Sequence, residues 1–289
     1  MRVSPPEAVV DLNGIKAEPE NEDVPFSALL AARMRIFFLA MILIAAALSE
    51  ELAVALDLFP KCEKAQFPGL RLYRSQCHGH IVLFLKTGVG PARAAAKLEK
   101  LLQSLAPEKV LCIGYAGALS SELRVGDLIV GRMALLVDPE TMAAPSLAEV
   151  EPRGEWELAA SDELTALARE SGIPVHGGTI LTSPFIIGDP SQKSLLQRRF
   201  GAIVVDMETA ALARICSSHG IPLSCVRAVS DGAHDTFLAP LSYDPQRTAL
   251  GRAVRVAGAG HWLRRLREWK ERSALARQSL RGFMKLYLR

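Results

Sequence analysis

AIVVDMETAALARICSSHGIPLSCVRAVSD, residues 202–231, is the segment that decides the predicted fold. It holds two apolar runs, residues 202–205 and 223–229, with the composition of buried strands. The residues between them form a small-residue packing side and predict a helix that stops at Gly220. Two strands joined by a helix of this length predict a β-α-β unit with parallel strands and a right-handed crossover.

The residues that follow the two strands predict a ligand site. In a parallel pair the carboxyl ends share one edge of the sheet, where α/β folds bind ligands. That edge would collect Asp206, Glu208, Arg227, Ser230 and Asp231. Each alone has a plainer interpretation, because an acidic residue at a helix start is commonly a cap or dipole partner, and Ser-Asp after a strand is commonly a loop cap. The predicted site therefore depends on the combination.

The composition predicts one globular α/β domain. The chain has 289 residues, 49% of them apolar and 22% charged, which is ordinary for a protein with a substantial core. A net charge of +3 gives no reason to expect a nucleic-acid partner. The five cysteines lack CxxC or Cys/His metal spacing, so we expect no metal site and a reducing, cytoplasmic setting.

The N-terminal region allows more than one interpretation. Residues 1–27 are polar and aperiodic, which is typical of disorder. The apolar run at 36–48 is too short for a membrane-spanning helix, which needs ~20 residues. Because Arg33 and Arg35 precede it, a signal peptide fits this run, and so does a buried first strand.

Two glycine-containing stretches are further candidates for ligand contact. The loop TGVGP at 87–91 precedes a predicted helix at 92–105, where unpaired amides favour an anion. It lacks the full GxGxxG pattern, so no dinucleotide cofactor is predicted. A predicted strand at 110–114 ends in GYAGAL, and its glycines let the backbone approach a ligand closely.

The motifs VVDMETAALA at 204–213 and VRAVSD at 226–231 resemble the signature of the nucleoside phosphorylase and nucleosidase superfamily. The most similar branch is that of the 5'-methylthioadenosine/S-adenosylhomocysteine nucleosidases, which cleave an N-glycosidic bond. Weaker matches extend the resemblance from about residue 41, where MILIAAALSEEL is similar to the family's first strand and acidic cluster. This favours the buried strand over the signal peptide, with translation starting at Met34 or Met41.

The resemblance implies a single α/β domain, a twisted mixed sheet with helices on both faces, over residues 34–245. Residues 1–33 would be a disordered or mis-annotated extension. Residues 246–289 would hold the last core helix and a basic amphipathic extension. Residues 247–289 contain twelve Arg or Lys and two acidic residues, so this tail either lies on an anionic membrane or a partner, or packs one helix face on the core.

The resemblance also implies roles for the residues of the site. Asp231 would be the general acid at purine N7, with a pKa raised by a dry pocket and a side chain oriented by Ser230. Glu51 would activate the attacking water. Glu208 would bind the ribose hydroxyls, and Met207 would lie against the sugar.

The remaining predicted contacts surround the base and the nucleophile. Phe185 and Ile186 would stack on the purine and offer main-chain hydrogen bonds. Arg227 would hold the nucleophile region or a phosphate. Two positions depart from the family pattern. Asp206 replaces the usual Glu, and Tyr115, before Ala116 and Gly117, replaces a small hydroxyl residue.

Three functions remain as hypotheses. The carboxylate at Glu51 and the single obvious cation, Arg227, favour hydrolysis of a methylthioadenosine-like nucleoside without metal or organic cofactor. The resemblance implies a homodimer whose second subunit closes the 5' end of the pocket. The nearest alternative is phosphorolysis of a purine nucleoside, including the lipid-linked adenosine of the hopanoid-associated branch. A non-catalytic nucleoside-binding protein is the third.

Overall fold

The computed structural model describes residues 41–59, 61–142, 149–236 and 262–289, with side chains described from residue 271 onward in the last range. The predicted extension at 1–33 and the apolar residues 36–40 lie outside the described residues. The division of the chain at residues 33 and 245 stays a prediction.

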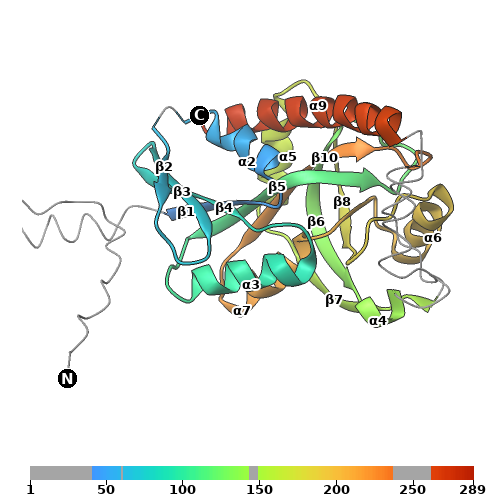
Figure 1. The fold of residues 1–289 in the computed structure, drawn as a ribbon, viewed down its shortest axis with the longest axis horizontal. Helices are drawn as coiled ribbons and strands as arrows, with labels where there is room; N and C mark the ends of the chain where they lie inside the picture. The colour runs from blue at the N-terminus through green and yellow to red at the C-terminus, as the bar shows by residue number, and fades with distance from the viewer. Residues whose placement is uncertain (1–40, 60, 143–148, 237–261) are drawn as a thin grey trace, which may run out of the picture.

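A ten-stranded mixed sheet forms the centre of the described structure (Figure 1). Its strands are β1 (Met41–Ala46), β2 (Glu63–Ala65), β3 (Arg71–Cys77), β4 (His80–Lys86), β5 (Lys109–Ala118), β6 (Leu128–Val137), β7 (Pro152–Glu157), β8 (Val175–Thr182), β9 (Val204–Asp206) and β10 (Leu223–Asp231). The helices are α2 (Ser49–Leu56), α3 (Pro91–Leu102), α4 (Pro139–Met142), α5 (Ser161–Arg169), α6 (Pro190–Phe200), α7 (Thr209–Ser218) and α9 (Trp262–Tyr287).

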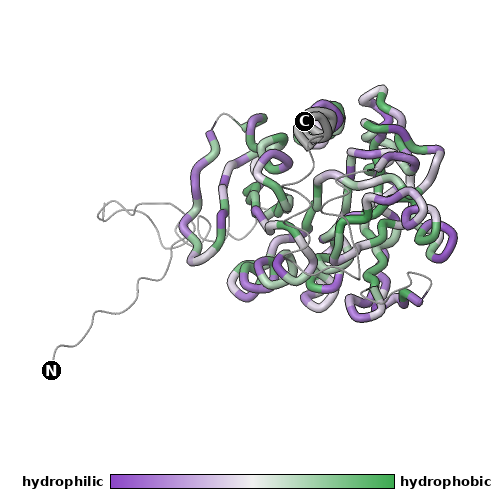
Figure 2. The backbone as a smooth tube through the Cα atoms, turned by 45° about the vertical axis from the view of Figure 1, so that its right-hand side comes forward, coloured by the Kyte–Doolittle hydropathy of each residue, from purple (hydrophilic) through white to green (hydrophobic). Residues whose placement is uncertain are grey.

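Helices cover both faces of the sheet, as predicted. Helices α2, α5 and α9 lie on one side of it and α3 and α7 on the other. Two apolar clusters fill these layers, one against α3 and α7 and one against α2, α5 and α9. Hydrophobic segments gather inside the molecule and hydrophilic ones on its outer turns (Figure 2). The predicted fold class is confirmed.

The predicted buried first strand is confirmed for Met41–Ala46. β1 lies between β4 and β5 and is parallel to both. Its residues Leu43, Ile44 and Ala45 are fully buried, because both faces of the sheet are covered here. The apolar composition of this part of the run therefore follows from its central place in the sheet.

The predicted β-α-β unit is wrong in one respect, because β9 and β10 are not parallel. β10 is parallel to β5, whereas β9 is antiparallel to it. The strands β5, β10, β6, β8 and β9 each pair with the next, and β9 with β5, so this part of the sheet closes on itself. β9 is three residues long and closes this ring of strands. Its direction is therefore set by its pairing with β5 and β8, and the helix α7 that follows it does not decide that direction.

The closed ring still brings the ends of β9 and β10 together, by another route. Gly117 of β5 pairs with Val205 of β9 on one side and with Asp231 of β10 on the other. A register shift between Val229 and Asp231 makes Asp231 the partner of Gly117. Such a bulge re-aims a side chain, a common use near ligand sites. The acidic residues that follow β9 and end β10 thus converge on the C-terminal half of β5.

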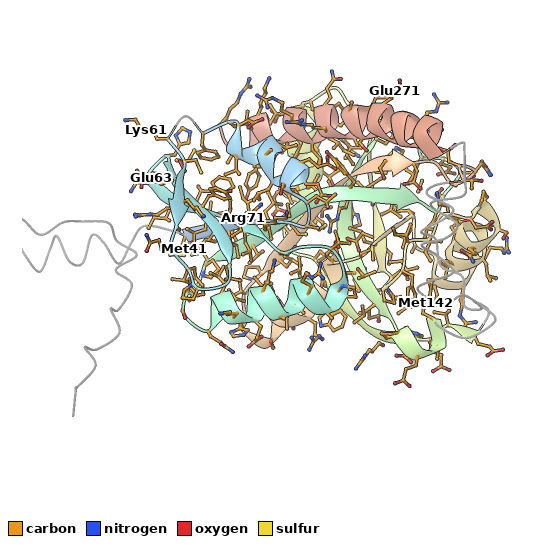
Figure 3. All side chains as sticks on the ribbon, in the orientation of Figure 1. Met41, Lys61, Glu63, Arg71, Met142 and Glu271 are labelled. Carbon is orange, nitrogen blue, oxygen red and sulfur yellow. The ribbon has the colours of Figure 1, made fainter. Side chains whose placement is uncertain are left out.

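Helix α9 packs its apolar face on the core, which is one of the two interpretations of the tail. Ala276, Leu280, Phe283 and Met284 follow helical spacing and are fully buried in the cluster shared with α2 and α5. The opposite side faces solvent, where Figure 3 labels Glu271. Among the described residues no helix has the length and apolar content to span a bilayer.

Candidate active site

A cavity of about 620 Å³ lies where the ends of β9 and β10 meet β5. Its volume is within the usual range for small-molecule sites, roughly 300–1,000 Å³. Every residue predicted for the site lines it except Arg227, which lies behind its wall. The predicted lining residues are Glu51, Tyr115, Ala116, Gly117, Phe185, Ile186, Asp206, Met207, Glu208, Ser230 and Asp231.

Glu51 is a buried carboxylate tied to two elements. One oxygen accepts from the Leu48 amide at 2.8 Å, as an acidic residue in a first helical turn commonly does. The other accepts from the Tyr115 amide of β5 at 2.9 Å. Burial raises the pKa of Glu51, against the nearby Arg227 charge and these two amides, which lower it. A carboxylate that is held in place and binds a proton more readily than usual suits a general base.

Arg227 lies behind the cavity wall and neutralises its carboxylates. Its guanidinium is 1% exposed and pairs with Asp206 at 2.6 Å, with Glu208 at 4.0 Å. It also donates to the Thr209 hydroxyl at 2.8 Å. Gly114 makes room for it, because a Cβ there would lie 2.1 Å from Arg227 Nη1 and 2.7 Å from Glu51 Oε1. The guanidinium therefore sits beside Glu51 without facing the cavity.

Asp206 lines the cavity, but its carboxylate is bound by the protein. It accepts from the Thr182 hydroxyl at 2.7 Å and from both the amide and the hydroxyl of Thr209, the first residue of α7. With Arg227 as a further partner, its oxygens are occupied. The geometry makes Asp206 a partner of Arg227 and of the amides at the start of α7, which agrees with the plainer of the two interpretations of this residue.

Glu208 occupies the anion position that the glycine loop provides. The Gly90 amide donates to Glu208 Oε1 at 2.9 Å, and the Gly88 amide donates to the Ala47 carbonyl at 3.1 Å. Gly88 and Gly90 have φ of 82° and 100°, which favour glycine. Burial and, after it, the Asp206 charge raise the pKa of Glu208 to about 8. The loop predicted to bind an external anion thus holds a carboxylate of the chain itself.

Asp231 is almost fully buried, at 2% exposed. The Ser230 hydroxyl donates to its Oδ1 at 2.8 Å, and the Lys193 ammonium donates to its Oδ2. A Cβ on Gly117 would lie 2.9 Å from Oδ2, so β5 needs a glycine beside this carboxylate. Its position is fixed from α6, β5 and β10 at once.

Lys193 is the residue that the sequence analysis missed. Its side chain is fully buried, and its ammonium also donates to the Gly232 carbonyl at 2.8 Å and reaches the Asp235 carbonyl at 3.4 Å. A signal for it exists in the sequence, since Lys193 shares its helical face with the buried Leu196. A lysine between polar residues is nevertheless typical of a solvated helix face.

Tyr115 and Phe185 both line the cavity, and each makes a backbone hydrogen bond with a neighbouring side chain. Tyr115 contacts Glu51 through its backbone amide, while its ring packs with the apolar cluster under α9. Burial, with a smaller effect of the Glu51 charge, raises the pKa of its phenol. The Ser183 hydroxyl donates to the Phe185 carbonyl at 2.8 Å and accepts from the Phe185 amide at 3.1 Å, and so connects the two ends of this turn.

The charges that line the cavity are mostly negative. Five carboxylates, those of Glu50, Glu51, Asp206, Glu208 and Asp231, share the wall with one described cation, Lys86. The Lys86 ammonium donates to the Ser49 hydroxyl at 2.7 Å. Among the described residues no group of three His, Cys, Asp or Glu side chains is arranged to hold a metal ion. The arrangement suits acid-base chemistry on a ligand without a large negative charge of its own.

Comparison with known proteins identifies relatives of this architecture. Residues 41–259 match the family model described as the phosphorylase superfamily. The 5'-methylthioadenosine/S-adenosylhomocysteine nucleosidase of Bacillus thuringiensis subsp. konkukian is 30% identical over 191 residues, which cover 64% of this chain and 83% of the relative. The nucleosidase of the same name from Bacillus anthracis matches with the same identity and coverage.

Two solved structures have the same fold. The nucleosidase of this name from Helicobacter pylori, with butyl-thio-DADMe-Immucillin-A, has a TM-score of 0.65 at 22% identity, over 86% of this chain and 97% of its own. The futalosine hydrolase of Helicobacter pylori has a TM-score of 0.65 at 21% identity, over 87% of this chain and 97% of its own.

The raised pKa of Glu208 predicts how stability changes with pH. The folded protein keeps a proton on Glu208 up to about pH 8, whereas the unfolded chain releases it near 4.5. The stability that this proton contributes is complete below the unfolded pKa and is lost as the pH rises through the folded pKa. We expect Glu208→Gln to reduce the fall in the free energy of unfolding between about pH 5 and pH 8.

Denaturant unfolding at a series of pH values measures this effect. Glu170→Gln, which removes an exposed carboxylate at the end of α5, is the matched control and should unfold with the pH dependence of the wild type. An unchanged slope in Glu208→Gln would show that Glu208 is not the linked group.

Proposed function

Since the chain belongs to the phosphorylase superfamily, as the resemblance of residues 204–231 predicted, we propose that it hydrolyses the N-glycosidic bond of an adenine nucleoside. The products are free adenine and the ribose moiety. The names of the curated relatives support a methylthioadenosine- or S-adenosylhomocysteine-like substrate. One observation carries the proposal: the Glu51 carboxylate, with its raised pKa, is fixed at the wall of a cavity that also holds Asp231.

The reaction needs a general acid that protonates the purine, a general base that activates the water, and groups that bind the sugar hydroxyls. As the C1'–N9 bond breaks, its electron pair goes to the purine, and Asp231 gives a proton to N7. The sugar becomes cation-like, and water adds to C1' while Glu51 takes the water's proton. Glu208 accepts hydrogen bonds from the ribose hydroxyls, Met207 lies against the sugar, and Phe185 and Ile186 lie against the purine.

Hydrolysis fits the charges of the site better than phosphorolysis does. Phosphate would enter a cavity lined by five acidic side chains and one described cation, and even with a proton on Glu208 the remaining carboxylates would repel it. The cation best placed to meet it, Arg227, is already paired with Asp206. The amides of Gly88 and Gly90 are bonded within the chain. Water needs none of these groups.

Release of adenine is the first measurement that tests this function. Methylthioadenosine, S-adenosylhomocysteine and adenosine are each incubated with the protein, with and without phosphate, and free adenine is quantified by chromatography. We expect release that does not depend on phosphate. Release only with phosphate would make the protein a phosphorylase, and no release from any substrate would support either a lipid-linked nucleoside as substrate or the nucleoside-binding alternative.

Two substitutions test the assigned roles. Asp231→Asn and Glu51→Gln should each lower kcat by about 10²–10⁴-fold, the usual contribution of a general acid or base. Glu50→Gln is the matched control, because Glu50 is the neighbouring carboxylate of the same helical turn and should leave most of the turnover. Thermal unfolding verifies that each variant is folded. Near wild-type turnover in Asp231→Asn would contradict the mechanism.

We also propose that the protein is a homodimer whose second subunit covers the outer end of the cavity. Val89 supports this, because it lines the cavity and yet is 41% exposed, unusual for a large apolar side chain in this structure. Light scattering over a range of concentrations measures the assembly. A monomer throughout would contradict the proposal.

A cytoplasmic setting with peripheral membrane contact is the remaining proposal. All five cysteines are free, as is usual in a reducing compartment. Residues 262–289 hold nine Lys or Arg and two acidic residues, a balance that favours anionic lipid. Cosedimentation with vesicles compares binding to anionic phosphatidylserine with binding to neutral phosphatidylcholine, and we expect binding to the first. Failure to bind either kind of vesicle would contradict membrane contact.

A further inference from the structure

Lys193 occupies a place that is costly for a cation. Its side chain is fully buried, and lysine is rarely so unless paired. It lies in the first turns of α6, where the helix dipole disfavours positive charge. Both costs are offset only if the ammonium pairs with a nearby anion.

The anion that faces Lys193 is the Asp231 carboxylate. The two carbonyls that complete the ammonium's contacts, those of Gly232 and Asp235, directly follow β10. The Asp235 carboxylate does not compete, because it pairs with Arg272 at 2.7 Å and accepts from the Gly232 amide at 2.8 Å. Among the described residues, Asp231 is therefore the carboxylate with which the buried Lys193 pairs.

Helix α6 holds Lys193 rigidly behind the cavity. Asp189 caps the helix by accepting from the amides of Ser191 at 2.9 Å and Gln192 at 3.2 Å, and Pro190 occupies its first position. Asp231 lines the cavity and Lys193 does not. The ammonium thus contacts Asp231 at Oδ2, whereas the Ser230 hydroxyl donates to Oδ1, and of the ion pair only Asp231 lines the cavity.

We propose that Lys193 is a positioning residue for the reaction, acting through Asp231. This inference rests on the proposed function. Asp231 carries a proton when the substrate is bound and gives it to purine N7 as the glycosidic bond breaks, which restores the carboxylate that pairs with Lys193 in the free protein. The Lys193 ammonium is already in place to stabilise that restored charge, and a preorganised contact of this kind lowers the barrier without tightening substrate binding.

The test removes the ammonium while keeping the length of the side chain. Lys193→Met should lower kcat for an adenine nucleoside by about 10²-fold or more, with KM little changed, as expected when an interaction is stronger in the transition state than in the substrate complex. Arg198→Met is the matched control, since it removes an exposed cation from the same helix. It should leave both constants unchanged.

A second substrate separates positioning from a structural role. A methylthioriboside whose leaving group is 4-nitrophenolate departs without a proton, so neither Lys193→Met nor Asp231→Asn should slow it by more than a few-fold. An equal loss on both substrates would mean that Lys193 only supports the fold, and would overturn the inference. So would wild-type turnover of the adenine nucleoside by Lys193→Met.

A double variant shows whether a loss of turnover in Lys193→Met comes from misfolding. Lys193→Met alone leaves a buried carboxylate unpaired, whereas Lys193→Met with Asp231→Asn removes both charges and should unfold thermally at a higher temperature than Lys193→Met. If the two residues act together, the double variant is no slower on adenine nucleosides than Asp231→Asn alone. A further, multiplicative loss would contradict the coupling. Absence of turnover in the wild type would instead overturn the proposed function, and this inference with it.

Discussion

The structure depends on two buried cations that let several carboxylates share one small cavity. Glu51, Asp206 and Glu208 would repel one another in an environment from which water is largely excluded. Arg227 lies behind them, paired with Asp206 at 2.6 Å and 4.0 Å from Glu208. Lys193 does the same for Asp231. Because neither cation lines the cavity, the carboxylate partner of each pair, Asp206 or Asp231, forms the wall there.

Such an arrangement constrains the strand between the charges. β5 passes beside Arg227, Glu51 and Asp231, and it can do so only where it has no side chain. Gly114 and Gly117 are those positions, since a Cβ at either would lie under 3.0 Å from a charged group. The same strand pairs with β1, β9 and β10, and so joins the sheet to the site. The glycines of GYAGAL are thus explained by packing against the protein's own side chains.

The features predicted correctly from the sequence are those with a local pattern, whereas the direction of a strand that pairs with distant strands was predicted wrongly. The buried strand at Met41–Ala46, the helix that follows Asp206 and the glycine turn before α3 all have signals within a few residues. The direction of β9 has none, because it depends on β5 and β8, which lie far away in the chain. Even so, the predicted residues meet at the cavity, since they cluster at the ends of short strands whichever way those strands run.

The positions of the two buried cations were not predicted for the same reason, because they depend on contacts between distant parts of the chain. Arg227 was expected at the site from its motif, but a motif does not tell whether a side chain faces a ligand or stands behind the wall. Lys193 belongs to no motif that we used, and its burial becomes visible only when α6 is packed on the end of β10. Pairing with a buried carboxylate is a long-range property, which periodicity on one helix does not reveal.

The position of Glu208 connects the fold to the choice of reaction. A helix start preceded by a glycine loop attracts an anion, and a chain that used this site for phosphate would have to keep the Gly90 amide free. Here the Glu208 carboxyl group takes that amide, beside the Asp206 and Glu51 carboxylates that line the same cavity. An incoming phosphate would therefore have to displace the Glu208 carboxyl group and then remain beside the Asp206 and Glu51 carboxylates, whereas a neutral water molecule beside Glu51 meets no such opposition. The electrostatics of the wall thus favour water as the nucleophile.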